Sequence, residues 1–136
     1  IEDDYGCINL WKNMLNQNGK IICFVPAFRI LWSHHDVSNK HFRRYSKKVL
    51  SNIFISNGLK IERTSFWNFF LFFPALLTRV FLKLFGISKN QLKHSPQVIN
   101  IILTKIIKIE NSLLRLINFP FGVSIFLIAR RIDKFK

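Results

Sequence analysis

The amino-acid sequence predicts an α/β fold, because helical and strand patterns alternate along the chain. A continuous apolar run of strand length occupies residues 21–25, and a second, largely apolar run occupies residues 123–129 near the end of the chain. Segments with the spacing of amphipathic helices precede and follow the first run. Such alternation is typical of α/β domains. The length of 136 residues and the lack of an internal repeat indicate one domain.

The first helix is expected over residues 3–17, where apolar side chains recur at steps of three and four residues. Asn18 and Gly19 are expected to end this helix as a C-cap. The apolar run at residues 21–25 follows and is closed by Pro26. Because every side chain of this run is apolar, the strand is expected to be covered on both faces, in the middle of a largely parallel sheet.

Residues 27–45 are polar, aromatic and basic, which predicts a long loop with one short helical turn near residues 30–32. Ser46 is expected to cap a second helix, which stops at Asn57. Polar and apolar side chains then alternate over residues 59–66. This alternation predicts a second strand that is half exposed or near the edge of the sheet.

A strongly apolar stretch over residues 66–85 is interrupted by polar residues, and its uninterrupted part is too short to span a bilayer. A polar turn is expected over residues 86–94 and a long amphipathic helix over residues 96–118. Two arrangements remain open for these helices. Either they bury their apolar faces against each other as a hairpin, or the first lies on a membrane surface with Arg79 and Lys83 on a polar stripe.

The chain is strongly basic, with 21 Lys and Arg against 7 Asp and Glu and a formal net charge of +14. Such a charge attracts polyanions or an anionic membrane surface, although codon drift in an AT-rich genome would also raise the number of lysines. The sequence contains no signature of a helix-turn-helix, RNA-recognition or zinc-finger module. We therefore expect no nucleic-acid partner and keep peripheral membrane contact as an expectation.

The start of the chain is acidic at residues 2–4, where a secretory signal would be basic. We expect a cytoplasmic protein, with any membrane contact at the inner face of the membrane. The first residue is Ile1, which we interpret as a cut end. Cys7 and Cys23 have no metal-ligand spacing and are expected to be reduced core thiols.

Three stretches of the chain together resemble a known family. They read GKIICFVPAFRILWSHHD at residues 19–36, KHFRRYSKKVL at residues 40–50 and PFGVSIFLIAR at residues 120–130. With the opening IEDD, they resemble the latter half of the class I S-adenosylmethionine-dependent methyltransferases of the type 11 methyltransferase family. The resemblance covers nearly the whole chain, and it is most specific in VPAFRILW, HHD and HFRRY.

The resemblance implies that residues 1–136 are the C-terminal half of a Rossmann-like methyltransferase sheet within a single domain. It implies that residues 20–25, 59–66 and 123–129 are the fifth, sixth and seventh strands. In this family the seventh strand lies antiparallel between the fifth and the sixth. Residues 68–118 are then expected to form a helical insertion on the acceptor side, before the last strand.

The resemblance also implies transfer of a methyl group from S-adenosylmethionine to a small-molecule acceptor, with a sugar or a lipid intermediate as candidates. The family binds this cofactor through a Gly-rich loop after the first strand and a carboxylate after the second, and the chain contains neither. Its five glycines stand singly, so we expect no cofactor-binding residues here and poor cofactor binding by the chain alone. The cofactor site is expected in a missing N-terminal half or a partner chain. The alternatives are a basic module that binds membrane surfaces and an inactive product of a split gene.

The loop after the fifth strand lies, by resemblance, at the carboxyl edge of the sheet, where ligands of open α/β folds bind. His35 and His41 are the candidate catalytic bases in this loop. The alternative role for a histidine here is to order the loop by bonding backbone carbonyls. No metal site is expected, because the histidines and Asp36 lack a recognisable ligand spacing.

The candidate substrate-binding residues in the same loop are Trp32, Asp36, Arg43, Arg44 and Tyr45. Adjacent arginines can bind a phosphate or carboxylate of the acceptor in bidentate fashion. The alternative is a structural ion pair between one arginine and Asp36, which would pin the loop over the active site. Trp32 would either wall an acceptor pocket or attach the loop to the core.

Overall fold

The computed structural model describes residues 1–85 and 97–132, so the turn predicted at 86–94 lies outside the described residues. Helices and strands alternate along the chain, and the mixed α/β class predicted from the sequence is confirmed. The elements are α1 (Asp4–Met14), β1 (Lys20–Pro26), the 3-10 turn η1 (Arg29–Leu31), α2 (His34–Ser38), α3 (Lys47–Ser56), β2 (Leu59–Trp67), α4 (Phe72–Leu84), α5 (Gln97–Leu114) and β3 (Ser124–Arg131).

The last strand lies in the middle of the sheet. The three described strands have the order β1-β3-β2, and β3 is antiparallel to both neighbours. The prediction that the final strand lies antiparallel between the two earlier strands is therefore confirmed. Its apolar sequence follows from this place, since Ile125, Leu127 and Ala129 are fully buried. β2 lies at an edge of the described sheet, as its alternating pattern predicts.

The prediction for β1 is wrong. β1 forms an edge of the described sheet and pairs antiparallel with β3, and the side chains of Ile22 and Phe24 are 64% and 57% exposed. An apolar run shows that the side chains on both faces of a strand are apolar. It does not show whether other elements cover both faces. Within the described residues, helices cover only one face of β1, and Phe24 packs on the other face beside Trp67 and Phe126.

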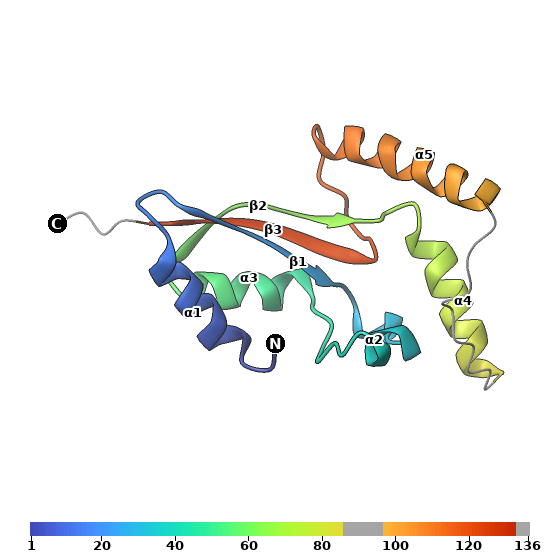
Figure 1. The fold of residues 1–136 in the computed structure, drawn as a ribbon, viewed down its shortest axis with the longest axis horizontal. Coiled ribbons are helices and arrows are strands. Elements are labelled where there is room, and N and C mark those ends of the chain that lie inside the picture. Colours follow the sequence, from blue (N-terminus) through green and yellow to red (C-terminus); the bar gives the residue numbers. More distant parts are fainter. Residues whose placement is uncertain (86–96, 133–136) are drawn as a thin grey trace.

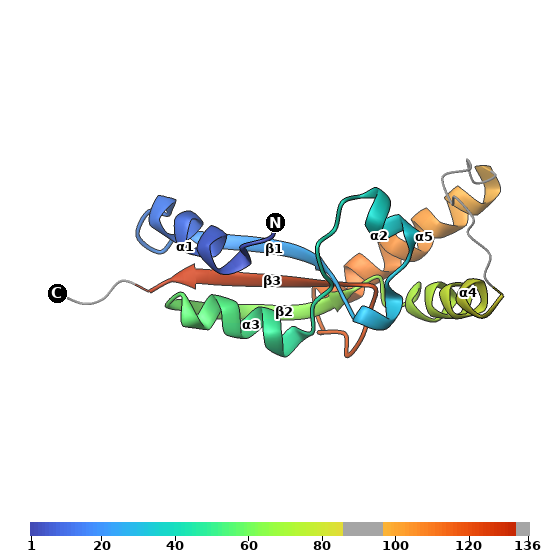
Figure 2. The ribbon, with the colours of Figure 1, turned by 90° about the horizontal axis from the view of Figure 1, so that it is seen from below.

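The hydrophobic core lies between the sheet and the two helices α1 and α3, which share one face of the sheet (Figures 1 and 2). Phe54 of α3 is fully buried and packs in one cluster with Ile8 of α1 and with Leu59 at the start of β2. Burial of a side chain of this size contributes about 1.5–3 kcal/mol. These contacts fix the orientation of α1 and α3 on the sheet.

The helix boundaries follow local capping. Ser46 caps α3 as predicted, since its hydroxyl accepts from the backbone N–H of Val49 at 3.3 Å, and the helix ends at Asn57. The end predicted for the first helix is wrong. α1 stops at Met14, because Leu15 is already extended, and Asn18 instead takes a positive φ of 59° in the turn that leads to β1.

Two helices, α4 and α5, stand between β2 and β3, and Figures 1 and 2 show them beyond one end of the sheet. We call residues 68–85 and 97–118 the helical arm. The hairpin arrangement is wrong for the described residues, because both helices keep large apolar side chains exposed. Side chains of β2 hold the arm to the sheet: Arg63 donates to Asn118 at 2.9 Å, and the indole N–H of Trp67 donates to Asn111 at 3.0 Å.

No helix in the described part of the chain is long and apolar enough to cross a membrane.

Candidate functional site

The segment from residue 27 to residue 45 leaves β1 at its carboxyl end and returns to the same point. The backbone N–H of Phe28 donates to the carbonyl of Tyr45, and the N–H of Tyr45 donates to the carbonyl of Pro26, each at 2.9 Å. The predicted short turn is present as η1. The sequence analysis missed α2, although Ser33 and Asp36 form a capping box that marks its start.

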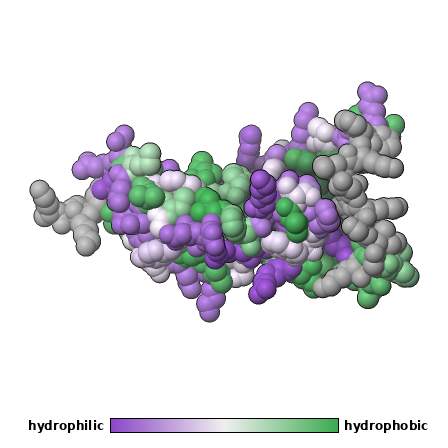
Figure 3. All heavy atoms as spheres, turned by 60° about the horizontal axis from the view of Figure 1, so that its bottom comes forward, coloured by the Kyte–Doolittle hydropathy of each residue, from purple (hydrophilic) through white to green (hydrophobic). Residues whose placement is uncertain are grey.

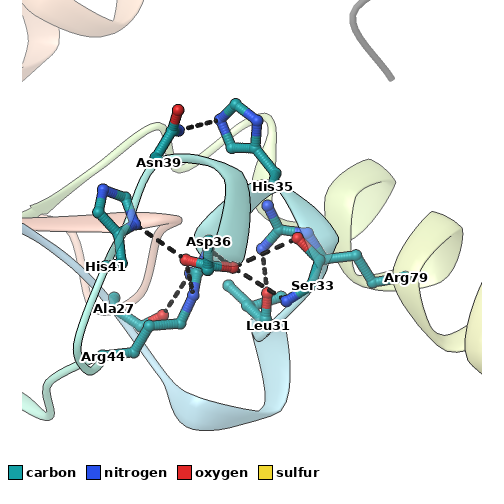
Figure 4. Close-up of polar contacts among 9 residues, drawn as sticks. All are labelled: Ala27, Leu31, Ser33, His35, Asp36, Asn39, His41, Arg44 and Arg79. Atoms are coloured by element: carbon teal, nitrogen blue, oxygen red, sulfur yellow. Dashed lines mark hydrogen bonds and ion pairs between the residues drawn. The ribbon is translucent and has the colours of Figure 1, made fainter. Parts of the chain in front are cut away.

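Several hydrogen bonds of the loop converge on Asp36 (Figure 4). Its carboxylate is fully buried and accepts two hydrogen bonds from the guanidinium of Arg44, at 2.9 and 3.0 Å. Arg44 also donates to the carbonyl of Ala27 at 2.9 Å, and Ser33 donates its backbone N–H to Asp36 at 2.9 Å. The structural ion pair is thus confirmed. Asp36 and Arg44 join both ends of the loop and are buried within it.

Asp36 is ionised at neutral pH. Burial works against its charge, but the hydrogen bonds from Arg44, His41 and Ser33 outweigh burial and lower the pKa of Asp36 below its usual range. An ionised carboxylate only accepts hydrogen bonds. The groups around Asp36 are therefore donors.

His41 is oriented by Asp36. Its Nδ1 lies 3.1 Å from Oδ1 of Asp36, and since the carboxylate only accepts, Nδ1 carries the proton. The neutral ring then has an unprotonated Nε2. The His41 side chain is 37% exposed, so the ring is held from one side and open on the other. A buried carboxylate behind an exposed imidazole is the arrangement in which a histidine serves as a general base.

His41 lies at the edge of a pocket of about 200 Å³. The pocket is bounded by α1, by the carboxyl end of β1, by residues 40–43 and by α3. Its wall is largely aromatic and apolar, with charged groups at one side. Its lining includes Asp4, Trp11, Lys40, His41, Phe42 and Arg43.

Tyr45 lines the same pocket, and its hydroxyl is hydrogen-bonded to α1. Its hydroxyl donates to Asp4 at 2.7 Å, and burial together with this hydrogen bond raises the pKa of Tyr45. The phenol is therefore a donor at any pH near neutrality and has no role as a base. It fixes the first turn of α1 against the loop.

Cys7 and Cys23 are both free thiols, as predicted, and both line the pocket, half buried. Burial, and then the nearby Cys7, raise the pKa of Cys23 to about 11. Cys23 is thus a neutral thiol near pH 7, because only a lowered pKa would populate its nucleophilic thiolate.

The other predicted site residues divide between the pocket and the outer surface. Arg43 lines the pocket, donates to the carbonyl of Glu2 at 2.6 Å and lies 3.6 Å from Asp4. His35 lies on the exposed side of α2, where its Nε2 is 2.9 Å from the amide nitrogen of Asn39, and it does not line the pocket (Figure 4). Trp32 is 40% exposed and does not line it either. The structure therefore brings together His41, Arg43 and Tyr45 and leaves out His35 and Trp32.

Sequence reasoning missed the contribution of α1 to the pocket. Asp4 and Trp11 come from a helix whose spacing indicates only a packed amphipathic face. It also misplaced Arg79, which does not lie on an outward polar stripe. The guanidinium of Arg79 turns inward and donates to the carbonyl of Leu31 at the end of η1 (Figure 4), and burial, followed by the charge of Arg44, lowers the pKa of Arg79.

The four glycines within residues 1–85 and 97–132 do not form a cofactor cradle. A Cβ at Gly6 would meet the Asp3 carboxylate at 2.2 Å, and one at Gly122 would meet the carbonyl of Trp67 at 2.4 Å, so these glycines serve close packing. Gly58, with φ of +73°, ends the turn after α3. These glycines therefore offer S-adenosylmethionine no Gly-rich backbone loop. Within the described residues, no cluster of three or more His, Cys, Asp or Glu could hold a metal ion.

No family model matches the chain, and no curated protein or solved structure is similar enough to it to count as a match.

Proposed function

We propose that this chain forms the acceptor side of an S-adenosylmethionine-dependent methyltransferase, with the cofactor held by elements that the chain does not contain. One observation carries the proposal. The stretches that resemble the family, residues 19–36 and 40–50, converge on a single site, where the Asp36–Arg44 pair closes the loop at the carboxyl end of β1. Ligands of open α/β folds bind at this edge.

The order of the strands adds support. A final strand that lies antiparallel between two earlier strands is the arrangement that the resemblance implies, and the described sheet has this arrangement. The third resembling stretch, residues 120–130, supplies most of that central strand. The order of the strands therefore supports the proposal.

His41 is the proposed general base. A hydroxyl or amine of the acceptor that lies in the pocket would give its proton to Nε2 of His41, and Asp36 would stabilise the resulting imidazolium. When bound by the complete protein, S-adenosylmethionine would supply the methyl group and leave as S-adenosylhomocysteine. Arg44 restrains Asp36, so the role proposed for Arg44 is to position the Asp36–His41 pair and not to touch the acceptor.

The pocket suits an acceptor with an apolar or ring-shaped body and an anionic group. Trp11 and Phe42 supply aromatic walls, and Arg43 and Lys40 supply positive charge. Aromatic walls bind sugar rings and lipid chains through their apolar faces, whereas guanidinium groups bind phosphates and carboxylates. A sugar phosphate or a charged lipid intermediate is the acceptor class we propose.

The test is a methyl-transfer assay with the protein encoded by the whole gene, methyl-labelled S-adenosylmethionine and the small-molecule fraction of a cell extract. We expect label in that fraction and a rate about 10²-fold lower for His41→Gln, since loss of a general base typically costs this much. His35→Gln, on the exposed side of α2, is the matched control and should keep its rate. No label transfer by the unaltered protein would refute the proposed activity, and equal rates for both variants would refute the role of His41.

A second measurement addresses the missing cofactor site. Calorimetric titration of the chain of residues 1–136 with S-adenosylmethionine should show no saturable binding, because its glycines stand singly. The coding DNA upstream of Ile1 is then read for an in-frame strand, Gly-rich turn and helix. Tight binding by the chain alone would contradict the proposal that elements outside this chain hold the cofactor.

A further inference from the structure

The outer face of α4 is apolar and exposed. Its side chains follow one another at spacings of four, three, one and three residues, which places them on a single helix face. They are between 40% and 77% exposed. These residues are Phe73, Leu77, Val80, Phe81 and Leu84.

This face is held outward by contacts on the opposite side of α4. The ring of Phe72 packs between Phe28 and Phe121, with centroid distances of 5.7 and 5.1 Å. Arg79 donates to the carbonyl of Leu31 from the same inner side. α4 therefore directs Arg79 toward the protein and keeps this apolar face exposed. This is the reverse of an ordinary surface helix.

α5 repeats the arrangement. Val98, Ile102, Ile109 and Leu113 follow one another at spacings of four, seven and four residues and are between 37% and 67% exposed. Glu110, on another side of the helix, is fully buried and accepts from the backbone N–H of Phe70 at 3.3 Å. α5 is thus also held with a row of aliphatic side chains outward.

Basic residues outnumber acidic residues in the helical arm. The helical arm contains five Lys or Arg, of which Arg79 turns inward, and a single acidic residue, Glu110, which is buried. Lys105 and Lys108 are exposed on the same helix as the aliphatic row. Exposed apolar side chains and exposed lysines therefore occur together on α5. In Figure 3, apolar colour is visible at the end of the molecule that carries the arm.

We propose that the outer face of the helical arm docks on an anionic phospholipid surface. Aromatic and aliphatic side chains on one helix face enter the boundary between head groups and acyl chains, and nearby lysines attract anionic head groups. Charge favours this occupant over a second copy of the chain, because two copies each carry a formal charge of +14 and repel. The inference does not depend on methyl transfer.

The test is co-sedimentation of the 136-residue chain with vesicles of phosphatidylcholine alone and of phosphatidylcholine mixed with phosphatidylglycerol. We expect binding to the anionic vesicles and much weaker binding to the neutral ones. Binding to the anionic vesicles should fall several-fold when the salt concentration rises from about 50 to about 500 mM, because salt screens the electrostatic attraction. Binding to neither kind of vesicle would overturn the proposal.

Matched variants separate the arm from the general charge of the chain. Leu77→Glu on α4 should lower the binding by roughly tenfold or more, because it places a carboxylate in the apolar face. Ile55→Glu on α3 makes the same change at an exposed apolar residue outside the arm and should bind like the unaltered chain. Lys108→Glu on α5 and Lys48→Glu on α3 form the corresponding pair for charge, because both change the net charge by the same amount. Lys108→Glu should weaken binding to anionic vesicles more than Lys48→Glu does.

Two outcomes would contradict the proposal even if the unaltered chain binds. Equal binding of Leu77→Glu and Ile55→Glu would mean that scattered lysines, not the arm, hold the vesicle. A chain that is dimeric in solution and becomes monomeric in Leu77→Glu would mean that a second copy covers the face. Far-UV circular dichroism of each variant shows whether it has kept its fold, and both mutated side chains are exposed, so folding should be kept.

Discussion

The body of the molecule and the helical arm use the same kind of amphipathic helix in opposite ways. In the body, α3 turns its apolar row inward, and Leu50 and Phe54 are buried against the sheet. In the arm, α4 turns the row that contains Leu77 outward and directs Arg79 to the protein. A periodic apolar pattern therefore predicts a helix in both regions, but it does not predict what covers the apolar face.

The difference follows from what each helix meets. α3 lies across strands whose inner side chains are apolar, so its apolar row gains most by facing them. α4 begins beyond the end of the sheet, where it contacts η1 and the carbonyl of Leu31. A buried carbonyl without a donor would cost about 1–3 kcal/mol, and Arg79 supplies that donor. The inner side of α4 is thus held by this polar contact and by the packing of Phe72 against Phe28 and Phe121, while its outer apolar face stays exposed.

The largest effect that separates the two regions is expected from truncation of equivalent apolar side chains. Phe54→Ala in the body should lower the free energy of unfolding by about 3–5 kcal/mol, because Phe54 is fully buried and a cavity remains. Leu77→Ala in the arm should change it by less than about 0.5 kcal/mol, because Leu77 is exposed. Urea unfolding of both variants measures this. Similar losses in both would mean that the outer face of α4 is packed in solution.

The next effect is expected at the loop that joins the regions. Arg44→Met should cost about 3 kcal/mol, because it leaves the carboxylate of Asp36 buried without its cation. Arg43→Met removes the neighbouring, exposed cation and should cost less than about 1 kcal/mol. The same unfolding measurement checks both. If the two variants were equally stable, the Asp36–Arg44 pair would not be what closes the loop.

A smaller effect should appear in the dependence of stability on pH. The folded pKa of Asp36 lies below its unfolded value of about 3.9, so its ionisation stabilises the fold fully above that value. This contribution is lost as the pH falls through the folded pKa. The unaltered chain should therefore lose stability below about pH 4 more steeply than Asp36→Asn, in unfolding curves recorded from pH 6 to about pH 3. Equal slopes would mean that Asp36 is not held in its charged form.

Much of the body could be predicted from the sequence, because its local signals agree with its packing. Ser46 marks the start of α3, and the alternation over residues 59–66 marks an edge strand. The structural pairing of an arginine with Asp36 was an open alternative that the structure confirms, since a loop with adjacent arginines and one carboxylate offers few other partners. The central place of β3 agrees with the arrangement that the resemblance implies.

The rest depends on contacts between distant segments that no local pattern contains. β1 has the composition of a covered strand, yet Ile22 is exposed, because coverage depends on a second layer. His35 and His41 look equivalent as titratable groups, but only His41 reaches Asp36 and the pocket, because α2 turns His35 outward. The sequence analysis missed α2 itself and so had no means of separating the two.

Hydrogen exchange of the chain, free and with vesicles that contain phosphatidylglycerol, tests most directly the claim that the body folds on itself while the arm meets an anionic surface. The account predicts that vesicles slow the exchange of amides in α4 and α5, because docking stabilises helices that pack on one side only. Amides of α3 and β3 should exchange alike with and without vesicles. Protection gained in α3 and β3 but not in the arm would contradict the account.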